Sequence, residues 1–216
     1  MLAWDDDHLA RRVAGRNFPD VEFESPSKLP ADRIPHADML VCKGWPGDAW
    51  SVLAVFSPRV IIAEGDVDPP TGYRAWVDEL EPRRFGAPLV GKRRMNVMLR
   101  EDLETLFRDF PFPDGSPSVL RHVLKEDLPR DERKGYLVSV DEPCRKPRYH
   151  KGPFPKVPGK DGPRRLTKPE SLMLYGFPPD YKTCGNASLH RMLSESMIPP
   201  MVMAIIDELR TWIDLT

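Results

Sequence analysis

Four groups of side chains in this sequence are of types that can carry chemistry. Glu64 directly follows the apolar run Arg59–Ala63, and a carboxylate at the end of a strand can hydrogen-bond a ligand. Lys92–Arg94 form a basic cluster suited to phosphate, and Asp5–Asp7 form an acidic cluster. Cys42 carries a thiol, which is a nucleophile only where its thiolate is exposed.

Each group also has an ordinary structural interpretation. Glu64 could simply be the first solvated residue after a strand, and Lys92–Arg94 could be a solvated loop; for both groups the two interpretations stay open. Asp5–Asp7 fit an acidic cluster stabilised by a helix dipole. Cys42 lies inside an apolar run, where a small buried hydrophobe is the favoured interpretation.

The elements that position these residues indicate an α/β fold. Asp38–Lys43 and Arg59–Ala63 are two near-continuous apolar runs, each followed by a polar loop, and this pattern predicts a parallel sheet. Ligands of such sheets bind outside the carboxyl ends of the strands. Met95–Arg100 reads as a later strand, and Gly72–Leu80 as a short helix or turn.

Helices are predicted at both ends of the chain. Asp7–Arg16 has apolar residues on one side, and Met201–Trp212 is a second, more apolar helix. Thr167 and Glu170 form the capping-box pattern of a helix start. The remaining predictions are a helix at Val119–Glu126, a turn and strand at Lys134–Val140, and a loop at Gly185-Asn186.

Size and composition suit one soluble domain, or one domain with a small lobe. The chain has 216 residues, 40% of them hydrophobic and 30% charged, with no apolar run long enough to cross a membrane. Its net charge of −1 argues against binding polyanions by bulk charge, so any nucleic-acid contact needs a local patch. The three cysteines have no metal-site spacing and form no disulfide framework, which fits the cytoplasm.

The segment Arg164–Tyr181, RRLTKPESLMLYGFPPDY, followed by SESMIPPM at Ser194–Met201, resembles the ninth and tenth motifs of the DNA (cytosine-5)-methyltransferases. Pro35–Ser51 resembles the fourth motif of the same family. There the nucleophilic cysteine of the family falls at Gly47, and a glycine cannot form the covalent adduct. The positions that the family uses for its fold therefore match this sequence, while the position of its nucleophile does not.

The resemblance assigns further roles to single residues. Glu64 falls where the family has the glutamate that hydrogen-bonds the cytosine ring edge, while the next two family residues, Asn and Val, are Gly65 and Asp66 here. Gly72–Arg94 resembles the motif that ends in two arginines. The first of these arginines falls at Gly91, and the second is kept at Arg93.

For the cofactor S-adenosylmethionine, the resemblance implies weakened binding. Asp5 falls near the acidic residue that binds the ribose hydroxyls of the cofactor. The loop D-L-F-x-G-x-G-G, which approaches the cofactor, would lie upstream of Met1, so we expect a fold without its first strand. The Gly-Asn pair that helps close the cofactor pocket falls at Ser194 and Glu195.

Three segments are predicted. Residues 1–142 form a shortened methyltransferase-like α/β domain, residues 143–168 a basic Pro/Gly-rich linker in place of a target-recognition region, and residues 169–216 the helices that complete the domain. The linker holds nine Lys or Arg residues against one Asp, either as a solvated loop or as a DNA-phosphate contact. The candidate DNA contacts are Arg145, Lys146, Arg148, Lys151, Arg164 and Arg165.

The leading hypothesis is a non-catalytic relative of these enzymes. It would act as a weak, sequence-independent DNA binder or as the partner of an active methyltransferase, away from membranes. The alternative is a split, truncated or inactivated cytosine-5 methyltransferase that transfers methyl groups when complemented. The candidate catalytic positions are Gly47, Glu64 and Arg93.

Overall fold

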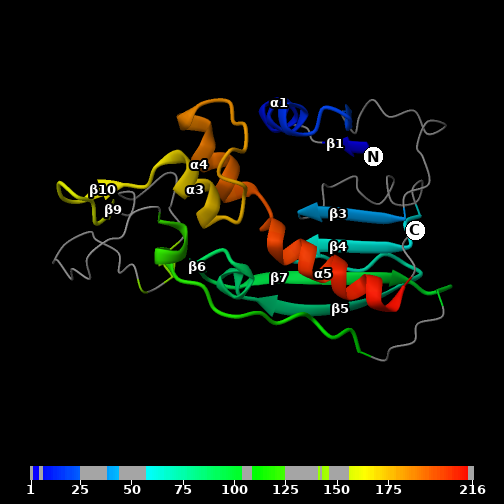
Figure 1. The fold of residues 1–216 in the computed structure, drawn as a ribbon. Helices are drawn as coiled ribbons and strands as arrows, with labels where there is room; N and C mark the ends of the chain where they lie inside the picture. The colour runs from blue at the N-terminus through cyan, green and yellow to red at the C-terminus, as the bar shows by residue number, and fades with distance from the viewer. Residues whose placement is uncertain are drawn as a thin grey trace. The chain divides into compact units, whose positions relative to one another are not determined.

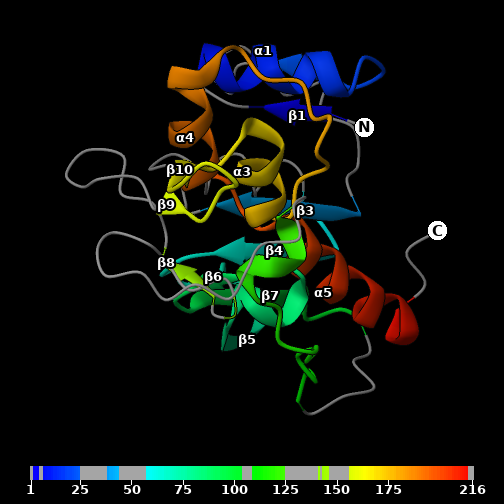
Figure 2. The ribbon, with the colours of Figure 1, turned by 60° about the vertical axis from the view of Figure 1, so that its left-hand side comes forward.

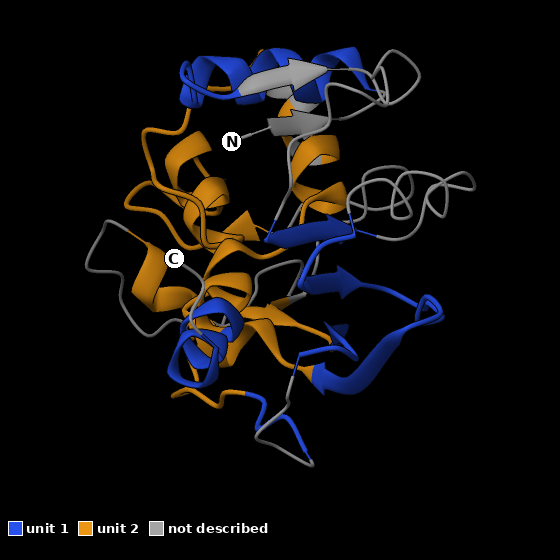
Figure 3. Ribbon diagram, turned by 90° about the vertical axis from the view of Figure 1, so that its right-hand side faces the viewer, with its two compact units in different colours: residues 1–79, 93–112, 205–216 blue, residues 80–92, 113–204 orange. Residues whose placement is uncertain are grey.

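The structure, a computed structural model, describes residues 2–4, 7–24, 38–43, 57–103, 109–124, 141, 143–145 and 156–213. The chain divides into two compact units, each made from segments that are separated in the sequence (Figure 3). The first unit comprises Met1–Glu79, Arg93–Phe112 and Ile205–Thr216, and the second comprises Leu80–Lys92 and Pro113–Ala204. Each buries apolar side chains, such as Ile61 in the first unit and Leu193 in the second.

The first unit begins with a strand–helix–strand segment made of β1 (Leu2–Trp4), α1 (His8–Asn17) and β2 (Glu22–Glu24). The two strands pair in parallel, and α1 lies beside β1 in Figures 1 and 2. The predicted helix at Asp7–Arg16 is confirmed, shifted by one residue. Asp7 is its N-cap and accepts a hydrogen bond of 2.8 Å from the backbone N–H of Leu9.

The main sheet of this unit has four strands in the order β3 (Met39–Lys43), β4 (Val60–Glu64), β7 (Arg93–Arg100) and β5 (Tyr73–Leu80) (Figure 1). β3 and β4 pair in parallel, as their apolar runs predicted. β7 pairs with β4 in the antiparallel direction, so the sheet is mixed and not wholly parallel.

Strand β4 lies at the centre of the core, and all five of its residues are buried. One apolar cluster joins three strands and the loop after β4, through Leu40, Ile61, Ala63, Val67 and Met98. Burial of each large apolar side chain contributes about 1.5–3 kcal/mol, so this cluster fixes the alignment of the strands. It thereby also fixes the position of the residue that ends β4, Glu64.

The prediction of a short helix or turn at Gly72–Leu80 is wrong, because this segment forms strand β5. Side chains alternate along it: Tyr73 and Ala75 pack against the core cluster, while Arg74 lies on the other side, over the ring of Trp76. β5 is an edge strand with few buried residues, so it shows little apolar periodicity and its conformation depends on pairing with β7.

The second unit is built from short elements. They are η3 (Pro82–Phe85), β6 (Leu89–Val90), η4 (Leu120–Val123), β8 (Cys144–Arg145), β9 (Lys156–Val157), β10 (Arg164–Arg165), α3 (Lys168–Leu174) and α4 (Asn186–Glu195). β6 pairs with β8 in parallel, and β9 pairs with β10 in the antiparallel direction. The helix predicted at Val119–Glu126 is only a 3-10 turn in the described part, which stops at Leu124, and Lys134–Val140 lies outside the described residues.

Two helices at the carboxyl end bear on the sequence predictions. α5 (Pro199–Trp212) confirms the predicted apolar helix and starts two residues earlier, with its buried face at Met201, Ile205 and Leu209. The prediction of a loop at Gly185-Asn186 holds for Gly185, the non-helical N-cap of α4, and is wrong for Asn186, the first residue of that helix. Glycine is an acceptable N-cap of a helix.

The capping box predicted at Thr167 is confirmed, and it includes a third residue. Thr167 and Glu170 exchange hydrogen bonds at the start of α3, and the Arg164 guanidinium donates two hydrogen bonds of 2.8 Å to the Glu170 carboxylate. Glu170 is only 1% exposed. Burial alone would raise the pKa of Glu170, but the hydrogen bonds from Arg164 and Thr167 outweigh it and hold the pKa below its ordinary value.

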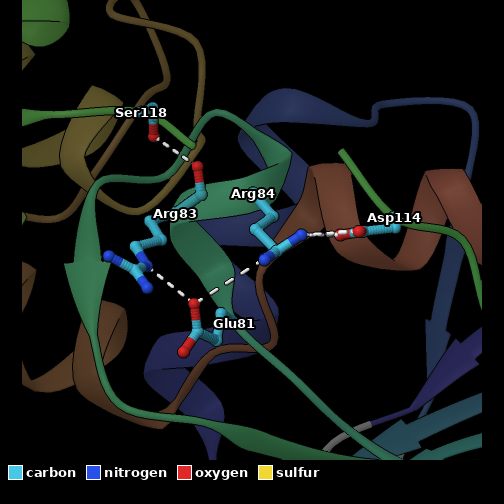
Figure 4. Close-up of polar contacts among 5 residues, drawn as sticks. All are labelled: Glu81, Arg83, Arg84, Asp114 and Ser118. Carbon is cyan, nitrogen blue, oxygen red and sulfur yellow. Dashed lines mark hydrogen bonds and ion pairs between the residues drawn. The ribbon is translucent and has the colours of Figure 1, made fainter. Parts of the chain in front are cut away.

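A second set of polar contacts ties the turn η3 to the segment 114–118 (Figure 4). Glu81 accepts a hydrogen bond from Arg83, Arg84 pairs with Asp114, and the Ser118 hydroxyl donates to the carbonyl of Arg83. Between these contacts, Gly115 passes so close to the carbonyl oxygen of Arg84 that a Cβ atom would overlap it. The segment can therefore cross η3 only with a glycine at this position.

We expect Gly115→Ala to destabilise the protein by about 3 kcal/mol, the upper end of overpacking costs, because a methyl group would collide with the Arg84 carbonyl. Gly86→Ala is the matched control in the same region: Gly86 has a φ of +83° but open space around its Cβ direction, so only about 1 kcal/mol of backbone strain is expected. Urea unfolding of both variants tests this, and equal losses would contradict the overlap.

Glu170 also predicts a pH dependence of stability. Its folded-state pKa lies below the unfolded value of about 4.5, so its contribution is fully present above pH 4.5 and is lost as the pH falls through the folded-state pKa. Glu170→Gln should cost about 3 kcal/mol at pH 7, and its deficit relative to wild type should shrink below pH 4.5. The exposed Asp180→Asn is the control, and a deficit that does not change with pH would contradict this assignment.

Candidate functional site

The last residue of β4, Glu64, is the centre of the candidate site. It is 5% exposed although it ends the strand, so the interpretation of Glu64 as a first solvated residue is wrong. In the sheet register Glu64 lies opposite Lys43 of β3 and Met95 of β7. Neighbouring strands on both sides of β4 therefore cover it, which a single apolar run in the sequence could not reveal.

Two cations from these neighbouring strands neutralise the buried carboxylate. Arg93, the first residue of β7, donates a hydrogen bond of 2.7 Å from Nη1 to Oε1 of Glu64, and Lys43 Nζ lies 3.7 Å from the same oxygen. The side chain of Arg93 is 14% exposed and that of Lys43 is 32% exposed. The structure thus brings together two residues that were proposed separately from the sequence, Glu64 and Arg93.

Only one oxygen of the Glu64 carboxylate is engaged by Arg93. Among the described residues, no hydrogen bond reaches Oε2 of Glu64, so this oxygen can accept an N–H from a bound ligand. The arginine supplies the opposite charge and holds the carboxylate in one direction. Such a pair suits recognition of the donor edge of a polar ring, because a carboxylate accepts from the exocyclic amine of cytosine.

The pair Arg94–Asp66 at the same end of the sheet is of a different kind. Arg94 Nη2 lies 3.5 Å from Asp66 Oδ1, and the two side chains are 50% and 92% exposed. Solvent screening leaves such exposed pairs with little net effect on stability. In the basic cluster Lys92–Arg94, Arg94 is therefore a solvated side chain, while Arg93 is largely buried.

Sequence reasoning missed Asn96 of β7, which contacts the backbone on both sides of Glu64. Its amide Nδ2 donates to the carbonyl of Ala63 at 3.1 Å and to that of Gly65 at 2.8 Å. Asn96 is completely buried. The signal that could have found it is a lone amide within the otherwise apolar run Met95–Leu99.

Several predicted site residues are not tested by the structure. Asp5, Gly47, Lys146, Arg148 and Lys151 lie outside the described residues. Arg145 is described only as the second residue of β8, and Arg165 is exposed on β10. Arg164 has its guanidinium on the Glu170 carboxylate, which engages much of the charge that was assigned to DNA.

Cys42 does not provide a substitute nucleophile. The residue lies half-buried on β3, and burial raises the pKa of its thiol to about 12. At neutral pH the reactive thiolate is therefore nearly absent. The prediction that Cys42 is a small hydrophobe in the strand fits its packing against the core cluster.

The described part of the chain contains neither a cluster of metal ligands nor a membrane-spanning helix. No three His, Cys, Asp or Glu side chains there lie close enough together to hold a metal ion. No helix among those residues has the length and apolarity that crossing a membrane requires.

Comparisons with known proteins give matches in structure and none in sequence. No model of a known protein family matches the chain, and no curated protein sequence matches it. A putative DNA modification methyltransferase of an Escherichia coli prophage matches with a TM-score of 0.75 at 13% identity, over 98% of this chain and 92% of the other. Dnmt2 of Schizosaccharomyces pombe matches with a TM-score of 0.71 at 17% identity, over 97% and 90%.

DNMT2 of Spodoptera frugiperda gives a third match, with a TM-score of 0.72 at 15% identity over 97% of this chain and 91% of the other. The chain therefore has the fold of the cytosine-5 methyltransferases, as its motifs predicted. At these identities the likeness establishes the fold, and function has to be argued from the site itself.

The residues present fit S-adenosylmethionine only in part. β1 and β2 form a parallel pair joined by α1, and Asp5 follows β1 in the sequence; the resemblance places Asp5 near the ribose-binding carboxylate that follows the second strand of the family. The printed sequence contains no glycine-rich D-L-F-x-G-x-G-G loop to approach the cofactor.

We expect Arg93→Met to destabilise the protein by about 3 kcal/mol, because Glu64 would stay buried with the more distant Lys43 as its only cation among the described residues. The double variant Glu64→Gln/Arg93→Met should recover part of this loss, since it removes both charges. Asp66→Asn, which breaks the exposed pair, is the control and should change little. Unfolding in urea measures all three, and a small loss for Arg93→Met would mean that the pair is not a buried one.

Proposed function

We propose that this protein is a non-catalytic relative of the cytosine-5 methyltransferases that binds DNA and holds a cytosine base at Glu64 and Arg93. The observation that carries the proposal is the buried ion pair at the end of β4, present in a chain that has Gly47 where the family has its nucleophile. The fold and the base-binding carboxylate are kept, while the group that would attack the base is absent.

The chemistry of the site supports binding without turnover. Methylation at carbon 5 in this family begins with a covalent bond from a cysteine to carbon 6, and neither Gly47 nor the half-buried Cys42 can form that bond. A charged carboxylate fixed by an arginine can still accept the N–H groups of a cytosine edge. Binding needs no leaving group and no cofactor.

Contacts to the DNA backbone are proposed to come from the basic residues of the segment 143–168. Arg145, Lys146, Arg148, Lys151 and Arg165 remain the candidates, and they would give salt-dependent affinity without sequence preference. The guanidinium of Arg164 is already bound to Glu170, so its part in this contact would be secondary. With a net charge of −1, the chain needs such a local patch for any contact with phosphate.

The alternative function is that of a split or inactivated methyltransferase which works when complemented. One observation favours it: among the described residues, β3 has a strand on one side only, and Val41 on that strand is 41% exposed. An additional parallel strand could pair along this edge. In this hypothesis, a partner chain that carries the glycine-rich loop would supply this additional strand.

The proposed function predicts a preference for cytosine. A duplex with one mismatched, easily extruded cytosine should bind about tenfold more tightly than the same duplex with thymine there, and Glu64→Gln should abolish this preference. Asp66→Asn, two residues further on and exposed, should keep it. Fluorescence anisotropy with labelled duplexes measures the six affinities.

The same preparation should transfer no methyl group from radiolabelled S-adenosylmethionine to cytosine-containing DNA. Methyl transfer by the wild type would overturn the proposal. Transfer that appears only with Gly47→Cys, or only after a second chain is added, would support the alternative function instead. Equal affinity for the cytosine and thymine duplexes would refute base binding at Glu64.

A further inference from the structure

We infer that Asn96 of β7 is a positioning residue for Glu64, whose amide holds the backbone on both sides of Glu64 and so fixes the direction of its carboxylate. The consequence for base recognition rests on the proposed function. The hold on Glu64 is a property of the free protein and can be tested without any ligand.

The geometry of the two hydrogen bonds carries the inference. Asn96 lies opposite Ala63 in the sheet register, and its Nδ2 donates to the carbonyls of Ala63 and Gly65, at 3.1 and 2.8 Å. All of Glu64, together with the N and Cα of Gly65, lies between these two carbonyls along the backbone. Because one planar amide binds both, the backbone dihedral angles of Glu64 have little freedom.

Strand β7 also holds the chain where it leaves β4. Gly65 has a φ of +121°, a conformation that glycine adopts readily, and its N–H donates to the carbonyl of Arg94 at 2.9 Å. Gly65 is therefore bound to β7 through both its N–H and its carbonyl. The same strand supplies Arg93 to the carboxylate, so one element sets the backbone and the side chain of Glu64.

Packing alone does not explain an amide at this position. Asn96 is completely buried, and its Oδ1 has no hydrogen-bond partner among the described residues. A buried acceptor without a partner is unfavourable, so an apolar side chain of similar size would suit the interior better. An apolar residue could not replace the two hydrogen bonds that Nδ2 of Asn96 donates.

A cycle of mutations in the free protein tests the hold on Glu64. The coupling free energy between Glu64 and Arg93 is measured from Glu64→Gln, Arg93→Met and the double variant, first in the wild type and then with Asn96→Leu added to each. We expect Asn96→Leu to reduce the coupling to about half or less. Without the two hydrogen bonds from Asn96, the Glu64 carboxylate would adopt more orientations and would pair with the Arg93 guanidinium for a smaller fraction of the time. An unchanged coupling would overturn the inference and leave Asn96 with a purely structural role.

Two further variants keep the test decisive. Met98→Leu is the control, since Met98 is also completely buried and lies on the same face of β7; it should leave the coupling unchanged. Asn96→Ser replaces Asn96→Leu if the latter does not fold, and its single hydroxyl donor should give an intermediate coupling. A coupling as strong with Asn96→Ser as in the wild type would refute the inference.

The consequence for the ligand is tested on the mismatched duplexes. With Asn96→Leu the expected tenfold preference for cytosine should fall below about threefold, while Met98→Leu should retain it. If the wild type shows no preference but Asn96→Leu still weakens the coupling, base binding fails and the positioning role stands. If the preference persists undiminished with Asn96→Leu, the positioning role fails and base binding stands.

Discussion

The arrangement of the site follows from one constraint, the burial of the Glu64 carboxylate. A charge that is 5% exposed at the end of a fully buried strand is tolerated only where opposite charge and hydrogen bonds reach it. The order of the sheet supplies these neighbours, because β3 brings Lys43 and β7 brings Arg93 to the two sides of β4. The order of the strands thus determines which cations lie beside the Glu64 carboxylate.

Fold and chemistry separate clearly in this protein. The apolar cluster, the capping box of α3 and the order of the strands all serve packing, and they agree with a fold found at only 13–17% sequence identity. Under the proposed function, chemistry depends on single atoms: the glycine at position 47, aligned with the nucleophile of the family, has no side chain for covalent catalysis. Under the same proposal, a scaffold without that atom would still recognise a base through the ion pair of Glu64 and Arg93.

Much of the fold could be predicted from the sequence because it rests on local patterns. The apolar runs gave β3 and β4, and Thr167 with Glu170 gave the start of α3. β5 was mistaken for a helix or turn because an edge strand is shaped by its neighbour and has little periodicity of its own.

The site was predictable only in part for a similar reason. Glu64 and Arg93 were recognised singly from motif matches, but the ion pair between them spans 29 residues and exists only through the sheet register. Asn96 matched no motif. Its role comes from two carbonyls that only the folded chain places within reach of one amide.

The bond between Arg164 and Glu170 has a consequence for how nucleic-acid binding in this protein should be mapped. A survey that replaces each basic residue of 143–168 by alanine would find a strong effect at Arg164, since its loss leaves the buried Glu170 carboxylate without this arginine's positive charge. That effect would measure misfolded protein, and it would be mistaken for a lost phosphate contact unless the folded fraction were determined for each variant.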